Sequence, residues 1–156
     1  MRTVEGFNDY ELLDADSGER LERWGDIILI RPDPTVMWNL PKINPLWNNA
    51  HAVYHRSNSG GGYWEKLKPV PDVWSIGYNE LTFRLKPMGF KHTGLFPEQA
   101  VNWDFISDLI KSANRPIKVL NLFAYTGGAT VAPLMENAHV VHVDASKGMT
   151  AWAKEN

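Results

Sequence analysis

The sequence contains no cysteine. This absence excludes a disulfide framework, a zinc–thiolate site, an iron–sulfur cluster and a cysteine nucleophile within the 156 residues. There is also no apolar run near the ~18–20 residues that span a bilayer, and the first ten residues lack the basic end and apolar core of a signal peptide. We therefore predict a cytoplasmic protein without a membrane partner.

An excess of charge of either sign is missing as well. The chain carries 16 Lys and Arg against 18 Asp and Glu, a formal net charge of -2, and the two signs are balanced along its length. No global electrostatic footprint for nucleic acid is visible, although a local basic groove formed on folding would escape this count. With 44% apolar and 22% charged residues, the composition is that of a folded globular protein.

Only one pair of residues in the sequence has a spacing that could suit a metal ion. His51 and His55 stand at i and i+4, which would place them on one face of a helix, but no third ligand lies near them in the sequence. We therefore predict two ordinary, partly buried histidines and no metal site.

Up to about residue 85 the pattern is typical of β-structure, with short apolar runs separated by turn residues. Tyr10–Leu13, a turn at residues 16–18 and a longer strand over Arg20–Ile30 predict one hairpin. Trp74–Tyr78 and Leu81–Lys86 predict a second hairpin.

Two further features belong to this β-rich part. Residues 57–62, with three consecutive glycines, predict a mobile loop. Five of the seven tryptophans precede Phe96, where they could stack on bases as in single-strand binders or pack into a core; we favour the core.

The periodicity changes after Leu85. Val101, Phe105, Ile106, Leu109 and Ile110 form one stripe on a helix whose first turn would contain Pro97 and Glu98.

A strand–helix–strand pattern follows this helix. Residues 117–123 form a nearly unbroken apolar run, as expected for a parallel strand covered on both faces, and residues 139–143 form another. The stretch between them is compatible with a helix that begins near Ala129 or Thr130, because Pro133 is tolerated only close to a helix start. The pattern predicts a βαβ unit.

Glycines and an acid stand where a βαβ nucleotide site needs them. Gly127 and Gly128 follow the first strand, where backbone N–H groups must approach a ligand closely. Asp144 directly follows the second strand, where a carboxylate can accept hydrogen bonds from ribose hydroxyls. Taken singly, the glycines could be only a turn and the aspartate only a helix cap. Their spacing on one βαβ unit favours a nucleotide site.

The identity of the nucleotide follows from two aromatic residues. A dinucleotide fingerprint GxGxxG would place glycines at 123, 125 and 128, but the first two positions hold Phe123 and Tyr125, which would obstruct a pyrophosphate. No GxxxxGK[ST] run for a triphosphate is present. S-adenosylmethionine has no phosphate, so a turn with fewer glycines can accommodate it.

Residues 119–129 (VLNLFAYTGGA) and 142–146 (HVDAS) resemble class I S-adenosylmethionine-dependent methyltransferases. More narrowly, they resemble the branch that includes bacterial 23S (large-subunit) ribosomal RNA cytosine-C5 methyltransferases, and residues 91–99 (KHTGLFPEQ) are similar to a loop that precedes its catalytic domain. The resemblance implies an α+β N-terminal module with antiparallel hairpins over residues 1–90. It further implies that residues 91–156 are the first βαβ unit of a truncated Rossmann-like α/β methyltransferase domain.

The resemblance also implies which residues bind the cofactor. The amino-acid and ribose part would contact Asn121, Phe123, Tyr125, Thr126, Gly127 and Gly128. Asp144 would bind the ribose hydroxyls, and the adenine would lie beside Ala145 and Ser146. The site would be closed from the other side by Lys91, Thr93, Gly94, Phe96 and Gln99. Lys91 is a candidate for the cofactor carboxylate, but a solvated loop lysine is an equal alternative.

No residue of the chain can be assigned to methyl transfer itself. A doubly wound sheet of this class has roughly six or seven strands, of which two are present here. The Asp-Pro-Pro-type motif of the resembled branch and its downstream catalytic cysteine are absent. We therefore expect the N-terminal portion of an RNA-directed methyltransferase, which would bind cofactor poorly and be inactive alone. The alternatives are a non-catalytic RNA- or protein-binding module, or a methyltransferase of a small molecule or protein.

Overall fold

The computed structural model describes residues 2–58 and 60–156, which pack as two compact units. The β unit consists of Phe7–Ile76 and Leu85–Thr93. The α/β unit consists of Met1–Gly6, Gly77–Arg84 and Gly94–Asn156. These two units describe how the chain packs. The predicted domain boundary at residue 90 concerns independently folding domains and stays a prediction.

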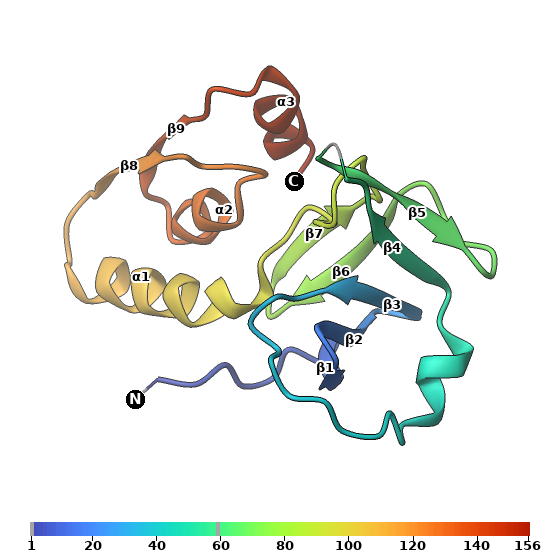
Figure 1. The fold of residues 1–156 in the computed structure, drawn as a ribbon. Coiled ribbons are helices and arrows are strands. Elements are labelled where there is room, and N and C mark those ends of the chain that lie inside the picture. Colours follow the sequence, from blue (N-terminus) through green and yellow to red (C-terminus); the bar gives the residue numbers. More distant parts are fainter. Residues whose placement is uncertain (1, 59) are drawn as a thin grey trace. The chain divides into compact units, whose positions relative to one another are not determined.

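The β unit is built on a five-stranded sheet in the order β1-β2-β3-β4-β5 (Figure 1). Three of the four neighbouring pairs are antiparallel, and only β3 and β4 are parallel. A short 3-10 helix, η1 (Pro45–Asn49), precedes β4. The strands are β1 (Tyr10–Asp16), β2 (Glu19–Trp24), β3 (Ile27–Pro32), β4 (Ala52–Arg56) and β5 (Gly62–Lys66).

Two features of this sheet differ from the sequence prediction. The single strand predicted over Arg20–Ile30 is wrong, because the chain turns at Gly25, whose φ of 64° lies in the left-handed region that favours glycine. The β4–β5 hairpin was not predicted, because its strands lack clear apolar alternation. The loop predicted to be mobile connects these strands; Ser59 in it lies outside the described residues, and its mobility stays a prediction.

The core of the β unit contains both apolar and charged side chains. Leu21, Trp24 and Leu29 are fully buried. Beside them, the guanidinium of Arg31 donates to both carboxylate oxygens of Glu22, at 2.6 and 2.7 Å. Packing of tryptophans into the core is thus confirmed for Trp24, whereas Trp38 is half exposed.

Strands β6 (Trp74–Tyr78) and β7 (Leu81–Leu85) form a two-stranded sheet, as predicted. The first element after these strands is η2 (Pro97–Gln99), a 3-10 turn that contains the proline and glutamate expected in the following helix. The later elements are α1 (Ala100–Ser112), β8 (Lys118–Leu122), α2 (Gly128–Met135), β9 (His139–Val143) and α3 (Lys147–Glu155).

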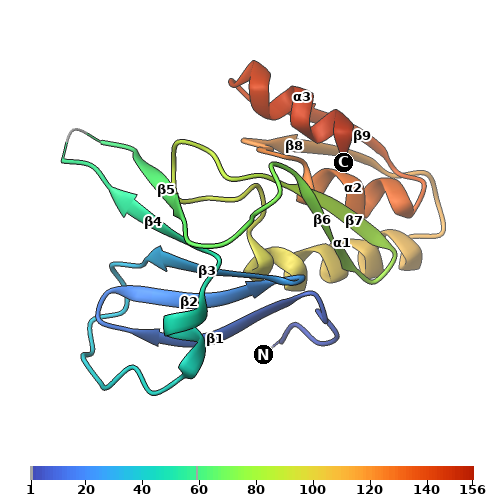
Figure 2. The ribbon, with the colours of Figure 1, turned by 90° about the vertical axis from the view of Figure 1, so that its right-hand side faces the viewer.

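Strands β8 and β9 pair in parallel, and α2 packs against both of them. Figure 2 shows α2 between these strands and α1, which packs on its other side. Helix α2 begins at Gly128, one residue before the predicted start, and leaves Pro133 inside its short length.

The two faces of the β8–β9 pair are buried to different extents. The face toward α2 carries partly buried Val119, Asn121, Val140 and His142. The opposite face is exposed: Leu120 is 62% and Val141 60% accessible. The prediction that β8 is covered on both faces is therefore wrong for this structure.

The described residues offer neither a helical membrane span nor a metal-ligand cluster. None of the helices within 2–58 and 60–156 is long and apolar enough to cross a membrane. The same residues contain no cluster of three or more His, Asp or Glu side chains that could hold a metal ion.

Candidate functional site

The turn between β8 and α2 has an unusual backbone. Phe123 and Tyr125 have φ angles of 54° and 52°, and Gly127 has a φ of 91°. The left-handed region is unfavourable for bulky side chains, and such residues concentrate at functional sites. The glycine positions of a dinucleotide motif thus keep a glycine-like backbone here but carry aromatic rings.

Asp144 joins this turn to the start of α3. Its Oδ2 accepts a hydrogen bond from the backbone N–H of Tyr125 at 2.9 Å, and its Oδ1 accepts one from Ser146 at 2.8 Å. The hydrogen bonds from Ser146 and Tyr125 lower the pKa of Asp144, so its carboxylate is ionised at neutral pH.

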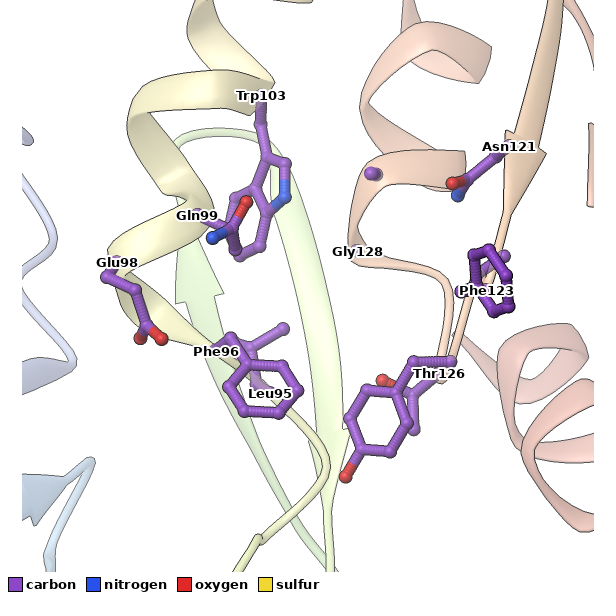
Figure 3. A pocket seen from close by; sticks show the side chains of 12 residues that line it. Leu95, Phe96, Glu98, Gln99, Trp103, Asn121, Phe123, Thr126 and Gly128 are labelled. Atoms are coloured by element: carbon purple, nitrogen blue, oxygen red, sulfur yellow. The ribbon is translucent and has the colours of Figure 1, made fainter. Parts of the chain in front are cut away.

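A cavity of about 470 Å³ lies between residues 95–103 and residues 121–129 of the α/β unit (Figure 3). Its walls are aromatic and polar, with one charged side chain among the described lining residues. They are Leu95, Phe96, Glu98, Gln99, Trp103, Asn121, Phe123, Ala124, Tyr125, Thr126, Gly128 and Ala129.

The structure gathers half of the fourteen residues expected from the sequence around this cavity. The seven that line it are Phe96, Gln99, Asn121, Phe123, Tyr125, Thr126 and Gly128. The sequence did not single out the other five, which are Leu95, Glu98, Trp103, Ala124 and Ala129. A signal for Trp103 existed, because a residue four positions after Gln99 lies on the same face of a helix.

Interactions within the α/β unit hold these residues in place. The Asn121 amide donates to Thr130 Oγ1 at 2.9 Å, and the same hydroxyl lies 2.9 Å from Nδ1 of His142. The rings of Phe96 and Tyr125 lie 5.3 Å apart in a tilted arrangement. The cavity wall is thus connected to both strands and to the segment before α1.

Two of the expected glycines allow close packing and do not line the cavity. A Cβ on Gly94, whose φ is 113°, would lie 2.2 Å from the Trp152 ring. A Cβ on Gly127 would lie 3.1 Å from that of Ala153. Both glycines therefore allow α3 to approach the turn. The hydroxyl of Thr126 donates to the Gly94 carbonyl.

The remaining expected residues lie outside the cavity wall. Ala145 and Ser146 are exposed just before α3, and the Ser146 hydroxyl accepts from Met149 N–H. Lys91 and Thr93 belong to the β unit. Thr93 is fully buried, and the Lys91 ammonium donates to the Pro32 carbonyl at 3.1 Å. Burial, followed by the charge of nearby Arg56, lowers the pKa of Lys91.

The known proteins that this chain resembles are methyltransferases. No protein-family model matches the chain. Over 97% of its length, it is 40% identical to the ribosomal RNA large subunit methyltransferase K/L of Shewanella baltica, and 28% identical to that of Pseudoalteromonas atlantica. The crystal structure of an S-adenosylmethionine-dependent methyltransferase from Agrobacterium tumefaciens matches 97% of the chain with a TM-score of 0.91 and 36% identity.

The chain is related to the class I S-adenosylmethionine-dependent methyltransferases. Its fold is methyltransferase-like, a mixed-sheet arrangement with three helices. A methyltransferase solved with S-adenosylhomocysteine has a TM-score of 0.67 at 20% identity, a likeness that shows the fold alone. The chain spans 24% of the length of the two curated relatives and 49% of the Agrobacterium protein.

Proposed function

We propose that this chain is the cofactor-binding part of an S-adenosylmethionine-dependent RNA methyltransferase and holds the cofactor in the cavity described above. The observation that carries the proposal is the position of this cavity. It lies against a left-handed turn at the carboxyl end of β8, where nucleotides bind in open α/β sheets, and Asp144 follows the neighbouring parallel strand.

The chemistry of Asp144 suits ribose binding. Each of its two oxygens accepts one backbone hydrogen bond, and a carboxylate oxygen has room for about one more. The ionised group can therefore hold the turn in place and accept from two ribose hydroxyls at the same time. A helix start without a phosphate cradle suits S-adenosylmethionine, and Phe123 and Tyr125 provide ring surface beside it.

The methyl acceptor is inferred from the relatives. The two curated relatives are named as ribosomal RNA large subunit methyltransferases, which makes ribosomal RNA the proposed substrate of the enzyme to which this chain contributes. Cytosine C5 as the target atom rests on the sequence resemblance alone and stays a prediction. We assign no residue of this chain to methyl transfer.

Titration of the chain with S-adenosylhomocysteine, followed by amide NMR, tests cofactor binding. We expect shifts at residues 121–129, and about a 10-fold loss of affinity in Asp144→Ala, because a hydrogen bond to a charged group is lost. Asp144→Asn, which keeps one acceptor oxygen, controls for collapse of the turn. Asp72→Ala, an exposed aspartate in the β unit, is the matched control.

Two outcomes would count against the proposal. The absence of shifts at millimolar ligand would reject the cofactor site. Equal affinity of wild type and Asp144→Ala would reject the ribose assignment while leaving the cavity as the site.

A further inference from the structure

One face of the five-stranded sheet gathers arginines from three neighbouring strands. Arg20 of β2 and Arg31 of β3 are directly opposite in the register, so their side chains leave the sheet on the same face. Leu29, which shares this face with Arg31, pairs in parallel with Ala52 of β4. Arg56 follows Ala52 by four residues on the same strand and therefore lies on this face too. Like charges placed side by side in a sheet repel each other.

A fourth cation comes from the segment after β7. The Lys91 ammonium donates to the Pro32 carbonyl at 3.1 Å, and the Arg31 guanidinium donates to the Lys91 carbonyl at 3.1 Å. The Tyr54 hydroxyl donates to the Gly89 carbonyl at 3.2 Å, which fixes this segment against β4. Lys91 is therefore held beside the carboxyl ends of β3 and β4.

The acids on this face neutralise only part of its positive charge. Asp33 forms an ion pair with the arginine of β2, and Glu22 with that of β3. In the ranges 2–58 and 60–156, Arg56 and Lys91 have no such carboxylate partner. Burial and then the charge of Arg56 lower the pKa of Lys91, which places these two cations near each other. Four cations against two acids leave an excess of two positive charges.

An exposed aromatic ring accompanies these two cations. Phe90, which is 40% exposed, directly precedes Lys91 in the chain. Arg56 is exposed as well. Cations bind the phosphates of nucleic acids, and exposed rings stack on unpaired bases. Single-stranded RNA offers both groups at once, whereas a free phosphate ion offers only the first.

We propose that Arg56 and Lys91 bind phosphates of an unpaired stretch of the RNA substrate, and that Phe90 stacks on a base beside them. This inference rests on the proposed function, which takes RNA as the methyl acceptor. The balanced charge of the sequence is compatible with it, because the excess arises only where three strands and one loop meet. It gives Lys91 a role in substrate binding, distinct from the cofactor contact that the sequence suggested.

Binding of a fluorescein-labelled single-stranded oligoribonucleotide to the full chain, measured by anisotropy at several salt concentrations, tests the proposal. Each phosphate contact on a single strand contributes about 0.7 to the slope of log affinity against log salt. Arg56→Gln and Lys91→Gln should each lower the slope by about this amount and weaken binding about 10-fold at low salt. Phe90→Ala should weaken binding about 5-fold or more at an unchanged slope.

Two further variants are matched controls. Lys68 donates to the Asn49 carbonyl at 2.8 Å, and its backbone N–H donates to the His51 carbonyl beside the start of β4. It therefore lies at the opposite end of this strand from Arg56, and Lys68→Gln should leave the slope unchanged. Arg56→Lys keeps the charge and should retain most of the slope.

Amide NMR of the wild-type chain keeps the test independent of how well a variant folds. The oligoribonucleotide should move the resonances of Arg56 and residues 89–92, and inorganic phosphate at the same phosphate concentration should leave them in place. Absence of RNA binding at low salt, equal loss of slope in Lys68→Gln and Lys91→Gln, or equal movement with phosphate alone would overturn the inference while leaving the cofactor site intact. A chain that binds RNA through these residues but not S-adenosylhomocysteine would instead overturn the proposed function.

Discussion

In the β unit, five of the six residues of β3 are buried, whereas β8 and β9 of the α/β unit alternate between partly buried and exposed residues. Strand β3 is flanked by β2 and β4 and is the centre of its sheet. Strands β8 and β9 form a sheet of two, with helix α2 on one face and exposed Leu120 and Val141 on the other. The central strand of the β unit is therefore more completely buried than either parallel strand of the α/β unit.

The two units also use polar side chains differently. The β unit buries Glu22 and Arg31 together, and their side chains hydrogen-bond to each other across strands β2 and β3. In the α/β unit, by contrast, Glu98 and Gln99 are exposed and line a cavity. The polar side chains at the cavity are therefore accessible to a ligand, whereas Glu22 and Arg31 are not.

The largest expected effect is loss of the buried ion pair of the β unit. Arg31→Met should lower the free energy of unfolding by about 3–5 kcal/mol, because it leaves the fully buried Glu22 carboxylate without its main partner. Urea denaturation measures the change. Glu11→Gln, which breaks the exposed pair with Arg23, should change it by less than about 1 kcal/mol. If Arg31→Met and Glu11→Gln lowered the free energy of unfolding equally, the buried pair would be no more important for stability than the exposed one.

A matched pair of leucines tests the contrast between the strands directly. Leu29→Ala in β3 should cost about 2–5 kcal/mol, since its side chain is fully buried. Leu120→Ala in β8, at a side chain that is 62% exposed, should cost about 0.5 kcal/mol or less. If both variants were equally destabilised, the exposed face of β8 would be covered in solution.

Gly128→Ala should have an intermediate effect in the α/β unit. The new Cβ would lie 2.8 Å from the Trp103 ring, so the helix start or the indole must shift, at about 1–3 kcal/mol. Thermal unfolding by circular dichroism measures the loss. Gly148→Ala in α3, where a Cβ meets nothing closer than 3.8 Å, is the control and should be neutral or stabilising. A neutral Gly128→Ala would show that the packing is looser than described.

The smallest effect is a pH dependence in the β unit. Burial alone would raise the pKa of Asp33, but hydrogen bonds from Arg20 and Thr35 outweigh it and lower the pKa to about 2. The unfolded chain binds this proton more readily, so the stabilisation is present above the ordinary value of 3.8 and is lost as pH falls toward 2.

Urea midpoints between pH 5 and pH 2 measure this contribution. We expect about 1 kcal/mol, less than the whole shift implies, because the Arg20 side chain is 32% exposed and solvent screens the pair. Asp33→Asn should unfold with a shallower pH dependence over this range. Identical slopes in variant and wild type would contradict the assignment.

Local patterns in the sequence were sufficient for several elements. The bounds of β6 and β9, the start of α2 within two residues and the presence of β8 all follow from periodicity and turn residues over short stretches. The same reasoning failed at Gly25, where a turn divides one predicted strand into β2 and β3. A single glycine within a strand-like pattern can mark either a bulge or a turn. Only the pairing of the flanking residues, here Trp24 with Ile27, shows which one is formed.

The sequence by itself determined the turn chemistry of the candidate site: glycines at 127 and 128, aromatic residues at 123 and 125, and an aspartate directly after β9. Only the tertiary structure decided which side chains face the cavity. Gly94 packs on Trp152 and Gly128 on Trp103, contacts between residues that are 58 and 25 positions apart in the chain. Such contacts depend on how α1, α2 and α3 pack together, and no local periodicity encodes that packing.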